Sequence, residues 1–203
     1  RAAPTESHMT EIVTLPDPLT DGQMSLETAL RRRHSVREFS TEPLALEDIS
    51  RLLWSAQGIT DASGHRTAPS AGATYPLELY LVTEDGVFNY VAQDHTLHRV
   101  REGDLRRDLF EASLEQEFIL EAPATIAFTA VFARTEQRYG PTRSPRYVHV
   151  EVGHAAQNLL LQAAALGLGA VPVGAYEDAR VSSVLDLPAD HVPLYLIPVG
   201  HTR

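Results

Sequence analysis

The sequence predicts an α+β fold, and three observations lead to this class. Residues 147–169 form a long run of helix-forming residues that ends at Gly167 and is apolar on nearly every side from Ala155 onward. Residues 124–133 are apolar and rich in β-formers, which favours a buried strand. Helices and strands otherwise mingle without regular βαβ units, so a doubly wound parallel sheet is not expected.

The N-terminal part differs from the rest of the chain. Residues 1–24 are polar, contain proline and show no sustained periodicity, so they are expected to form an N-terminal extension. Residues 6–9 read ESHM, which is typical of a cloning junction, and residues 1–8 are therefore expected to be a vector-derived tag. Residues 25–203 are long enough to form one domain with a sizeable core.

Four helices are expected in the order of the chain. Ser25 is placed to cap a helix from Leu26 to about Arg33. Residues 46–57 carry apolar side chains at helical spacing, and Gly58 is expected to end that helix. Residues 104–123 have a helical pattern, and a short helix is expected near residues 179–185.

The expected strands lie between these helices. Residues 77–83 and 87–92 predict a strand pair with its turn at residues 84–86, and residues 192–200 predict a last strand. The segment before the strand pair, residues 59–76, is a long loop of small residues. Loops longer than about 12 to 15 residues inside a compact domain are usually functional or disordered.

Composition excludes several classes of protein. The chain of 203 residues has 27 acidic and 17 basic residues, a formal charge of −10, which argues against a general nucleic-acid binder. No apolar run approaches the roughly 18 residues that span a bilayer, so no membrane association is expected. The chain has no cysteine, which excludes disulfides and thiolate chemistry and fits a cytoplasmic location. It also has no lysine, so every fixed cation is an arginine.

Several familiar motifs fail on their spacing. Residues 167–174 contain Gly-Leu-Gly, but they follow a helix, and their third glycine, Gly174, is too far along the chain for the dinucleotide fingerprint. His149 and His154 are five residues apart and cannot share a helix face as zinc ligands do. No GxSxG nucleophile motif is present. His95 and His98 lack a third ligand, so no metal site is expected.

One cluster of positive charge stands out in this acidic chain. Residues 31–39 read RRRHSVREF, and Arg33 and Arg37 straddle the predicted helix end with His34 and Ser35 between them. Guanidinium groups bind phosphate bidentately, and a hydroxyl with free backbone amides completes such a cradle. A solvated helix end with favourable cations is the alternative, and position alone leaves it open. Arg31 and Arg32 are assigned to the surface.

Five collinear segments decide between these readings. They read RHSVREF, LEDISRLLWSAQGIT, APSAGATYPLELYLV, EVGHAAQNLLLQAAALGLGAVPVGAY and YLIPVG, in this order from about Leu26 to Gly200. Together they resemble the nitroreductase superfamily, and within it the SagB-type dehydrogenase branch most closely. The resemblance covers most of the chain.

The resemblance implies an FMN enzyme with a central, mostly antiparallel sheet flanked by helices, built as an intertwined homodimer with two flavin sites at the interface. Matched by position, the segment for the FMN phosphate and ribityl chain comprises Arg33, His34, Ser35 and Arg37. The loop that reaches the partner's flavin comprises Pro69, Ser70, Ala71, Gly72 and Ala73. The stretch against the isoalloxazine ring comprises Pro172, Val173, Gly174 and Ala175, and Arg203 matches a basic residue of the phosphate site.

The resemblance also implies the chemistry. We expect an FMN-dependent oxidoreductase that passes hydride from NAD(P)H to a nitro-, quinone- or enone-type acceptor. The alternatives are azoline-to-azole oxidation of a modified peptide, as in the SagB-type branch, and a non-catalytic flavin-binding scaffold subunit. Azoline oxidases carry a Lys-Tyr pair before the long helix, and the matching residues here are Arg138 and Tyr139. Arginine stays protonated and is no base, so azoline oxidation is expected to be absent or very slow.

Five further residues receive two readings each. Tyr75 and Tyr139 either line the substrate side or are core residues with one hydrogen bond each. Glu151 is expected to be an interface or structural acid rather than a base. Gln157 and Asn158 are expected either to reach the flavin or to cap a neighbouring loop.

Overall fold

A single antiparallel sheet organises the protein, in a computed structural model that describes residues 11–203. The predicted vector-derived residues 1–8 lie outside the described residues. The sheet has seven strands in the order β1-β4-β3-β2-β5-β7-β6, and every neighbouring pair is antiparallel. The strands are β1 (Ile12–Thr14), β2 (Leu77–Thr83), β3 (Gly86–Val91), β4 (Thr96–Glu102), β5 (Ala124–Ala130), β6 (Gly169–Ala170) and β7 (Val192–Gly200). The predicted α+β class and antiparallel sheet are confirmed.

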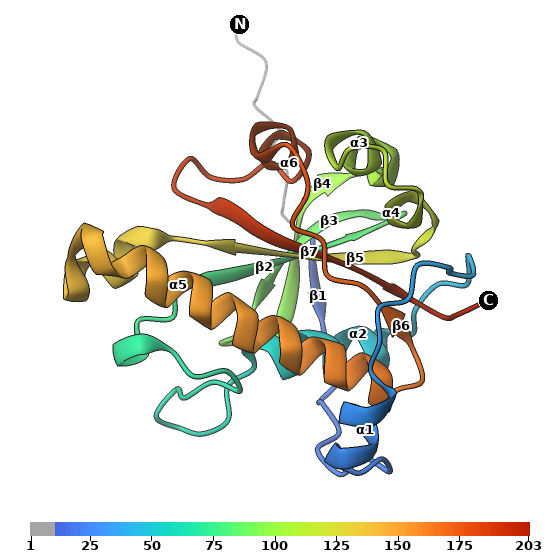
Figure 1. Cartoon of the computed structure of the whole chain (residues 1–203), viewed down its shortest axis with the longest axis horizontal. Helices are drawn as coiled ribbons and strands as arrows, with labels where there is room; N and C mark the ends of the chain where they lie inside the picture. Colours follow the sequence, from blue (N-terminus) through green and yellow to red (C-terminus); the bar gives the residue numbers. More distant parts are fainter. Residues whose placement is uncertain (1–10) are drawn as a thin grey trace, which may run out of the picture.

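Helices cover both faces of this sheet, as Figure 1 shows with the sheet seen nearly edge-on. One hydrophobic core lies between the sheet and α2 and α5, and a second lies between the sheet and α3 and α6. The helices are α1 (Leu26–Arg32), α2 (Leu46–Gln57), α3 (Arg106–Ala112), α4 (Glu117–Glu121), α5 (Phe132–Ala165) and α6 (Asp178–Val184), with a short 3-10 turn, η1 (Ala71–Ala73). None of the described helices is both long and apolar enough to cross a membrane.

The predicted helix boundaries at α1 and α2 are confirmed. Ser25 caps α1 because its side chain accepts a hydrogen bond from the backbone N–H of Thr28. Gly58 ends α2, but it does not form a left-handed cap, since its φ is −64°. A Cβ at this position would collide with the indole ring of Trp54, so the glycine is needed for close packing.

The sheet contains strands that the sequence did not reveal. β1 pairs with the edge of β4, with Ile12 opposite His98, so part of the expected N-terminal extension belongs to the sheet. β4 follows β3 through a tight turn at His95, whose φ of 51° is left-handed. Its outward side chains are charged, which hides the strand in a search for apolar runs.

Two helical segments differ from their prediction. The expected helix over residues 104–123 is split into α3 and α4, because Leu114 and Glu115 both have positive φ. The long helix α5 begins at Phe132, well before the predicted start, and it has 34 residues. Its first part is set off by a kink at Gly140 (φ 75°, ψ 164°), after which Pro141 starts the straight part. The predicted short helix and last strand are confirmed as α6 and β7.

Candidate functional site

The arginine-rich segment leaves α1 and runs beside the short strand β6. The backbone N–H of Arg33 closes α1 on the carbonyl of Ala29 at 2.9 Å. Two residues later, Ser35 forms a parallel bridge with Ala170, and the N–H of Val36 donates to the Ala170 carbonyl at 3.0 Å. This pairing fixes the segment against the sheet.

A shallow pocket of about 180 Å³ opens beside this segment. It is lined by Arg32, Arg33, His34, Val36, Leu160, Ala164, Gly167, Leu168, Ala170 and Thr202. Within residues 11–203 no carboxylate lies within ion-pair distance of either arginine. Arg32 is exposed, as the sequence predicted, and it also lines the pocket. We call these residues the arginine pocket.

Arg37 and Arg203 lie together at α4, outside the residues that line the arginine pocket. The Arg37 guanidinium carbon is 5.8 Å from the ring centroid of Phe118. Arg203 Nη2 is 3.6 Å from Glu121 Oε1, so its charge already has a partner on the same helix.

The predicted ring-binding stretch continues directly from β6. Val173 pairs with Leu196 of β7 through two backbone hydrogen bonds of 2.8 and 3.0 Å. Pro172 is half-buried, whereas Gly174 and Ala175 expose their backbone. The Ala175 carbonyl accepts a hydrogen bond from Gln116 Nε2 at 2.9 Å. The structure thus brings residues 172–175 close to the segment that contains Ser35.

The small-residue loop around Ser70 has an unusual backbone. Gly72, Ala73 and Tyr75 have φ values of 59°, 54° and 45°, all in the left-handed region. Residues other than glycine rarely adopt this backbone conformation. Such strain persists only where surrounding contacts enforce it. Ser70 supplies two of these contacts, because its carbonyl accepts from Ala73 N–H at 3.0 Å and its Oγ from Tyr75 N–H at 2.9 Å.

The first part of α5 holds the same loop from the other side. Arg138 Nη1 donates to the Gly72 carbonyl at 3.0 Å, and Arg134 Nη1 donates to the Tyr75 carbonyl at 3.0 Å. A Cβ on Gly72 would lie 2.6 Å from both Arg138 Nε and Tyr139 Oη. The structure therefore brings the predicted pair Arg138 and Tyr139 into direct packing with the predicted flavin loop.

A buried acid lies under this loop. Glu151, in the middle of α5, is 2% exposed, and its Oε1 has no hydrogen-bond partner among the described residues. Burial raises the pKa of Glu151 to about 7, while the Ser70 hydroxyl and the Arg66 charge oppose the shift. The sequence identified Glu151 as a structural or interface acid but gave no sign of its position beneath Ser70.

Within one chain the Ser70 loop and the arginine pocket are separate. The loop runs antiparallel to α5, toward the start of the helix. Asn158 Nδ2 donates to the Thr67 carbonyl at 3.2 Å, and Ser70 lies near Glu151. The arginine pocket instead uses Ala164, near the end of the helix. At 1.5 Å per residue, Glu151 and Ala164 are about 20 Å apart along the axis. Figure 1 shows the loop under one end of α5 and α1 with β6 at the other.

Comparison with known proteins shows the family to which this fold belongs. The family model described as "Nitroreductase family" matches residues 30–201. The chain belongs to the nitroreductase family. A protein of Methanocaldococcus jannaschii with a provisional nitroreductase name is 43% identical over 184 residues, which cover 88% of this chain and 91% of that protein. The crystal structure of a provisionally named nitroreductase from Ralstonia eutropha superposes with a TM-score of 0.86 at 31% identity, covering 95% and 90% of the two chains.

A relative outside the simple nitroreductases has a different name. The trifolitoxin-processing protein TfxB of Rhizobium leguminosarum is 30% identical over 188 residues. The match covers 84% of this chain and 50% of TfxB, so the chain spans about half the length of that protein. The predicted family resemblance is confirmed, and this nitroreductase family member is an oxidoreductase.

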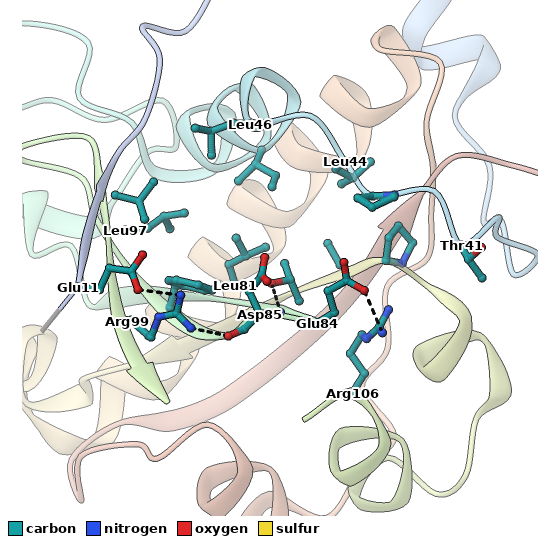
Figure 2. A pocket seen from close by; sticks show the side chains of 17 residues that line it. Glu11, Thr41, Leu44, Leu46, Leu81, Glu84, Asp85, Leu97, Arg99 and Arg106 are labelled. Carbon is teal, nitrogen blue, oxygen red and sulfur yellow. Dashed lines mark hydrogen bonds and ion pairs between the residues drawn. The ribbon is translucent and has the colours of Figure 1, made fainter. Parts of the chain in front are cut away.

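The nitroreductase chain has another cavity of about 220 Å³ that contains none of the predicted site residues. Figure 2 shows its apolar floor between α2 and the β2–β3 turn, with charged side chains at the rim. Those charges are already used: Arg99 donates to the Asp85 carbonyl at 2.6 Å and pairs with Glu11 at 2.8 Å. This cavity therefore offers no free charge for a cofactor phosphate.

Proposed function

We propose that the protein is an FMN-dependent oxidoreductase that passes hydride from NAD(P)H to a nitro-, quinone- or enone-type acceptor. The observation that carries this proposal is the arginine pocket: two cations that have no carboxylate partner within residues 11–203, side by side in an acidic chain. Such a site suits a phosphate, because guanidinium groups bind it with paired, charge-assisted hydrogen bonds.

The residues present fit the parts of FMN. Arg33, His34 and Ser35, with Arg32 beside them, would hold the phosphate and ribityl chain. Arg37 follows this segment in the chain, and Arg203 follows Thr202, which lines the pocket, so both would contribute from its border. The exposed backbone at Gly174 and Ala175 would lie against the flat ring, where small residues permit close approach.

A homodimer would complete the site. The Ser70 loop lies near Glu151 of α5, whereas the arginine pocket of its own chain uses Leu160 and Ala164 toward the other end of the helix, so a second copy that brings its loop to this pocket would complete the site. Apolar side chains are available for such a contact: Val150 on α5 and Leu26 and Leu30 on α1 are more than half exposed. We therefore propose that residues 69–73 of each chain close over the flavin of the partner.

In this arrangement the flavin supplies the hydride chemistry when it is bound. The chain's own residues bind and orient it. Arg32 and Arg33 neutralise the phosphate, and the Ser70 loop excludes water from the ring. Arg138 and Tyr139 keep Gly72 in its left-handed conformation, so they act on the shape of the loop rather than as acid or base.

The direct test is turnover. The purified protein supplied with FMN is expected to oxidise NADH or NADPH when menadione or a nitroaromatic compound is present. Protein that binds FMN but oxidises neither nicotinamide would favour the scaffold alternative. Protein that does neither would contradict the proposal.

A second candidate is the oxidation of azolines in a modified peptide, which the similarity to TfxB favours. The contacts of Arg138 argue against azoline oxidation. Arg138 stays protonated and already donates to the Gly72 carbonyl, so it supplies no base for removing a proton from an azoline. We therefore rank this activity second.

A further inference from the structure

A polar cavity of about 300 Å³ lies where α2 ends, β2 begins and β3 ends, apart from the arginine pocket. Its polar lining comes from Gln57, Arg66, Glu78, Asn89, Gln93 and Arg134. Leu77, Leu79 and Val91 also border it, but Leu77 and Leu79 are only 2% and 1% exposed, so they offer almost no apolar surface to it. We call this space the Arg66 cavity. Its lining is mainly polar and charged, which suits the charged group of a small ligand.

Arg66 brings a positive charge that has no direct ion pair. Its Nη1 donates to Gln57 Oε1 at 3.3 Å, and its guanidinium carbon lies 5.0 Å from the ring centroid of Tyr75. Within residues 11–203 no carboxylate lies within ion-pair distance of it, although the charge of Glu78 acts on it from farther away. Burial lowers the pKa of Arg66, because the cation has lost water, and the Glu78 charge only opposes this shift.

The one carboxylate in the cavity is already engaged. Glu78 Oε1 pairs with Arg134 Nη2 at 2.5 Å, and Arg134 also holds the Tyr75 carbonyl. With these two charges cancelled, the cavity keeps one net positive charge at Arg66. A half-buried cation in this state gains most from an anion that enters the cavity.

Hydrogen-bond donors point to the same missing partner. Gln57 is 1% exposed, and its Nε2 has no acceptor among the described residues. Arg66 Nε is also without an acceptor there. Buried donors are normally paired, so two unpaired donors next to each other mark a place that lacks oxygen atoms.

We propose that the Arg66 cavity binds the carboxylate of a small organic acid. Because Arg66 stacks on Tyr75, which ends the Ser70 loop, the bound acid lies beside the predicted flavin loop. The acid is then an acceptor substrate, or part of one. This last step rests on the proposed function, whereas the binding of the acid does not.

Binding is tested first on the protein as purified, by calorimetry with benzoate, benzyl alcohol and inorganic phosphate. Benzoate is expected to bind and the neutral alcohol is not. Arg66→Gln is expected to weaken benzoate binding at least tenfold, and Arg66→Lys, which keeps the charge, to weaken it less. Arg99→Gln is the matched control, since Arg99 also stacks on an aromatic ring but lies at the other cavity, and it is expected to leave benzoate binding unchanged.

Failure to bind benzoate, or equal binding by Arg66→Gln, would overturn the proposal. Phosphate binding without benzoate binding would overturn the choice of an organic acid. Circular dichroism of each variant establishes that it is folded. If Arg66→Gln does not fold, Arg66→Lys still tests the proposal.

The role in turnover is tested by a ratio of KM values. 4-Nitrobenzoate and nitrobenzene differ only in the carboxylate, so a general disturbance of the loop changes both KM values alike. Arg66→Gln is expected to raise the KM for 4-nitrobenzoate about tenfold relative to that for nitrobenzene. An unchanged ratio would exclude the acid as an acceptor. Absence of any turnover would contradict the proposed function and leave the binding result standing.

Discussion

Arg138 donates a hydrogen bond from Nη1 to the carbonyl of Gly72 at 3.0 Å, and its side chain fills the space that a Cβ on Gly72 would need. The two residues are 66 positions apart in the chain. Their contact links the start of α5 to the strained loop that contains Ser70. It assigns Arg138 to the support of the loop, where an azoline oxidase would have a lysine.

Gly72→Ala is expected to destabilise the protein by about 1 to 3 kcal/mol, because alanine at φ 59° is strained and its Cβ displaces Arg138 and Tyr139. Urea unfolding measures the difference. Gly22→Ala is the control, since nothing lies within 4 Å of a Cβ there, and its effect should stay within about 0.5 kcal/mol. Equal stability of the two variants would show that the loop is not held as described.

Local patterns in the sequence were sufficient for much of the fold. The period of apolar residues predicted α2, and the uninterrupted apolar run predicted β5, because both elements bury whole faces. β4 was missed because its side chains are largely polar, and the start of α5 because Gly140 and Pro141 normally mark a helix end.

The candidate site likewise has a part that the sequence could predict and a part that it could not. That Arg33 and His34 lie together was predictable because they are adjacent in the chain, whereas Arg37 lies outside the arginine pocket, against Phe118. The positions of Glu151 under Ser70 and of Arg66 against Tyr75 depend on contacts between distant segments. Periodicity and local composition carry no information about such contacts.

Stability is expected to depend on the protonation of Glu151. Its pKa is about 7 in the folded protein and 4.5 unperturbed, so between these values the folded state holds a proton that the unfolded state has lost. Stability should therefore fall as pH rises from about 4.5 to 7 and then level off, by about 3 kcal/mol in total. Glu151→Gln should remove this part of the slope in urea unfolding. A slope identical to that of the original protein would contradict the buried neutral acid.

The oligomeric state is expected to be a homodimer whose two copies complete each site. Light scattering at micromolar concentration should give twice the mass of one chain, 22.3 kDa. Val150→Glu places a charge on an exposed apolar position of α5 and should shift the protein toward monomers with loss of flavin. A monomer with full flavin occupancy would contradict the shared site.

Azoline oxidation is expected to be absent or very slow. Thiazoline and oxazoline peptides are incubated with the FMN-loaded protein, and mass spectrometry follows the loss of two hydrogens that accompanies azole formation. Nitroaromatic reduction with NAD(P)H in the same preparation shows that the protein is active. Rapid azole formation that persists in Arg138→Ala would show that no lysine-like base is needed and would make azoline oxidation the leading function.

FMN binding at the arginine pocket is the measurement on which the assignment depends most. The purified protein should be yellow or should take up added FMN with a quenched flavin fluorescence. Arg33→Ala should weaken binding by about 2 kcal/mol, or about 30-fold in Kd, because it removes a charge-assisted phosphate contact. Arg51→Ala, which changes an arginine on α2 outside the pocket, should not alter the Kd. A protein that stays colourless and binds no added FMN, or an Arg33→Ala variant that binds FMN as tightly as the original, would contradict the assignment.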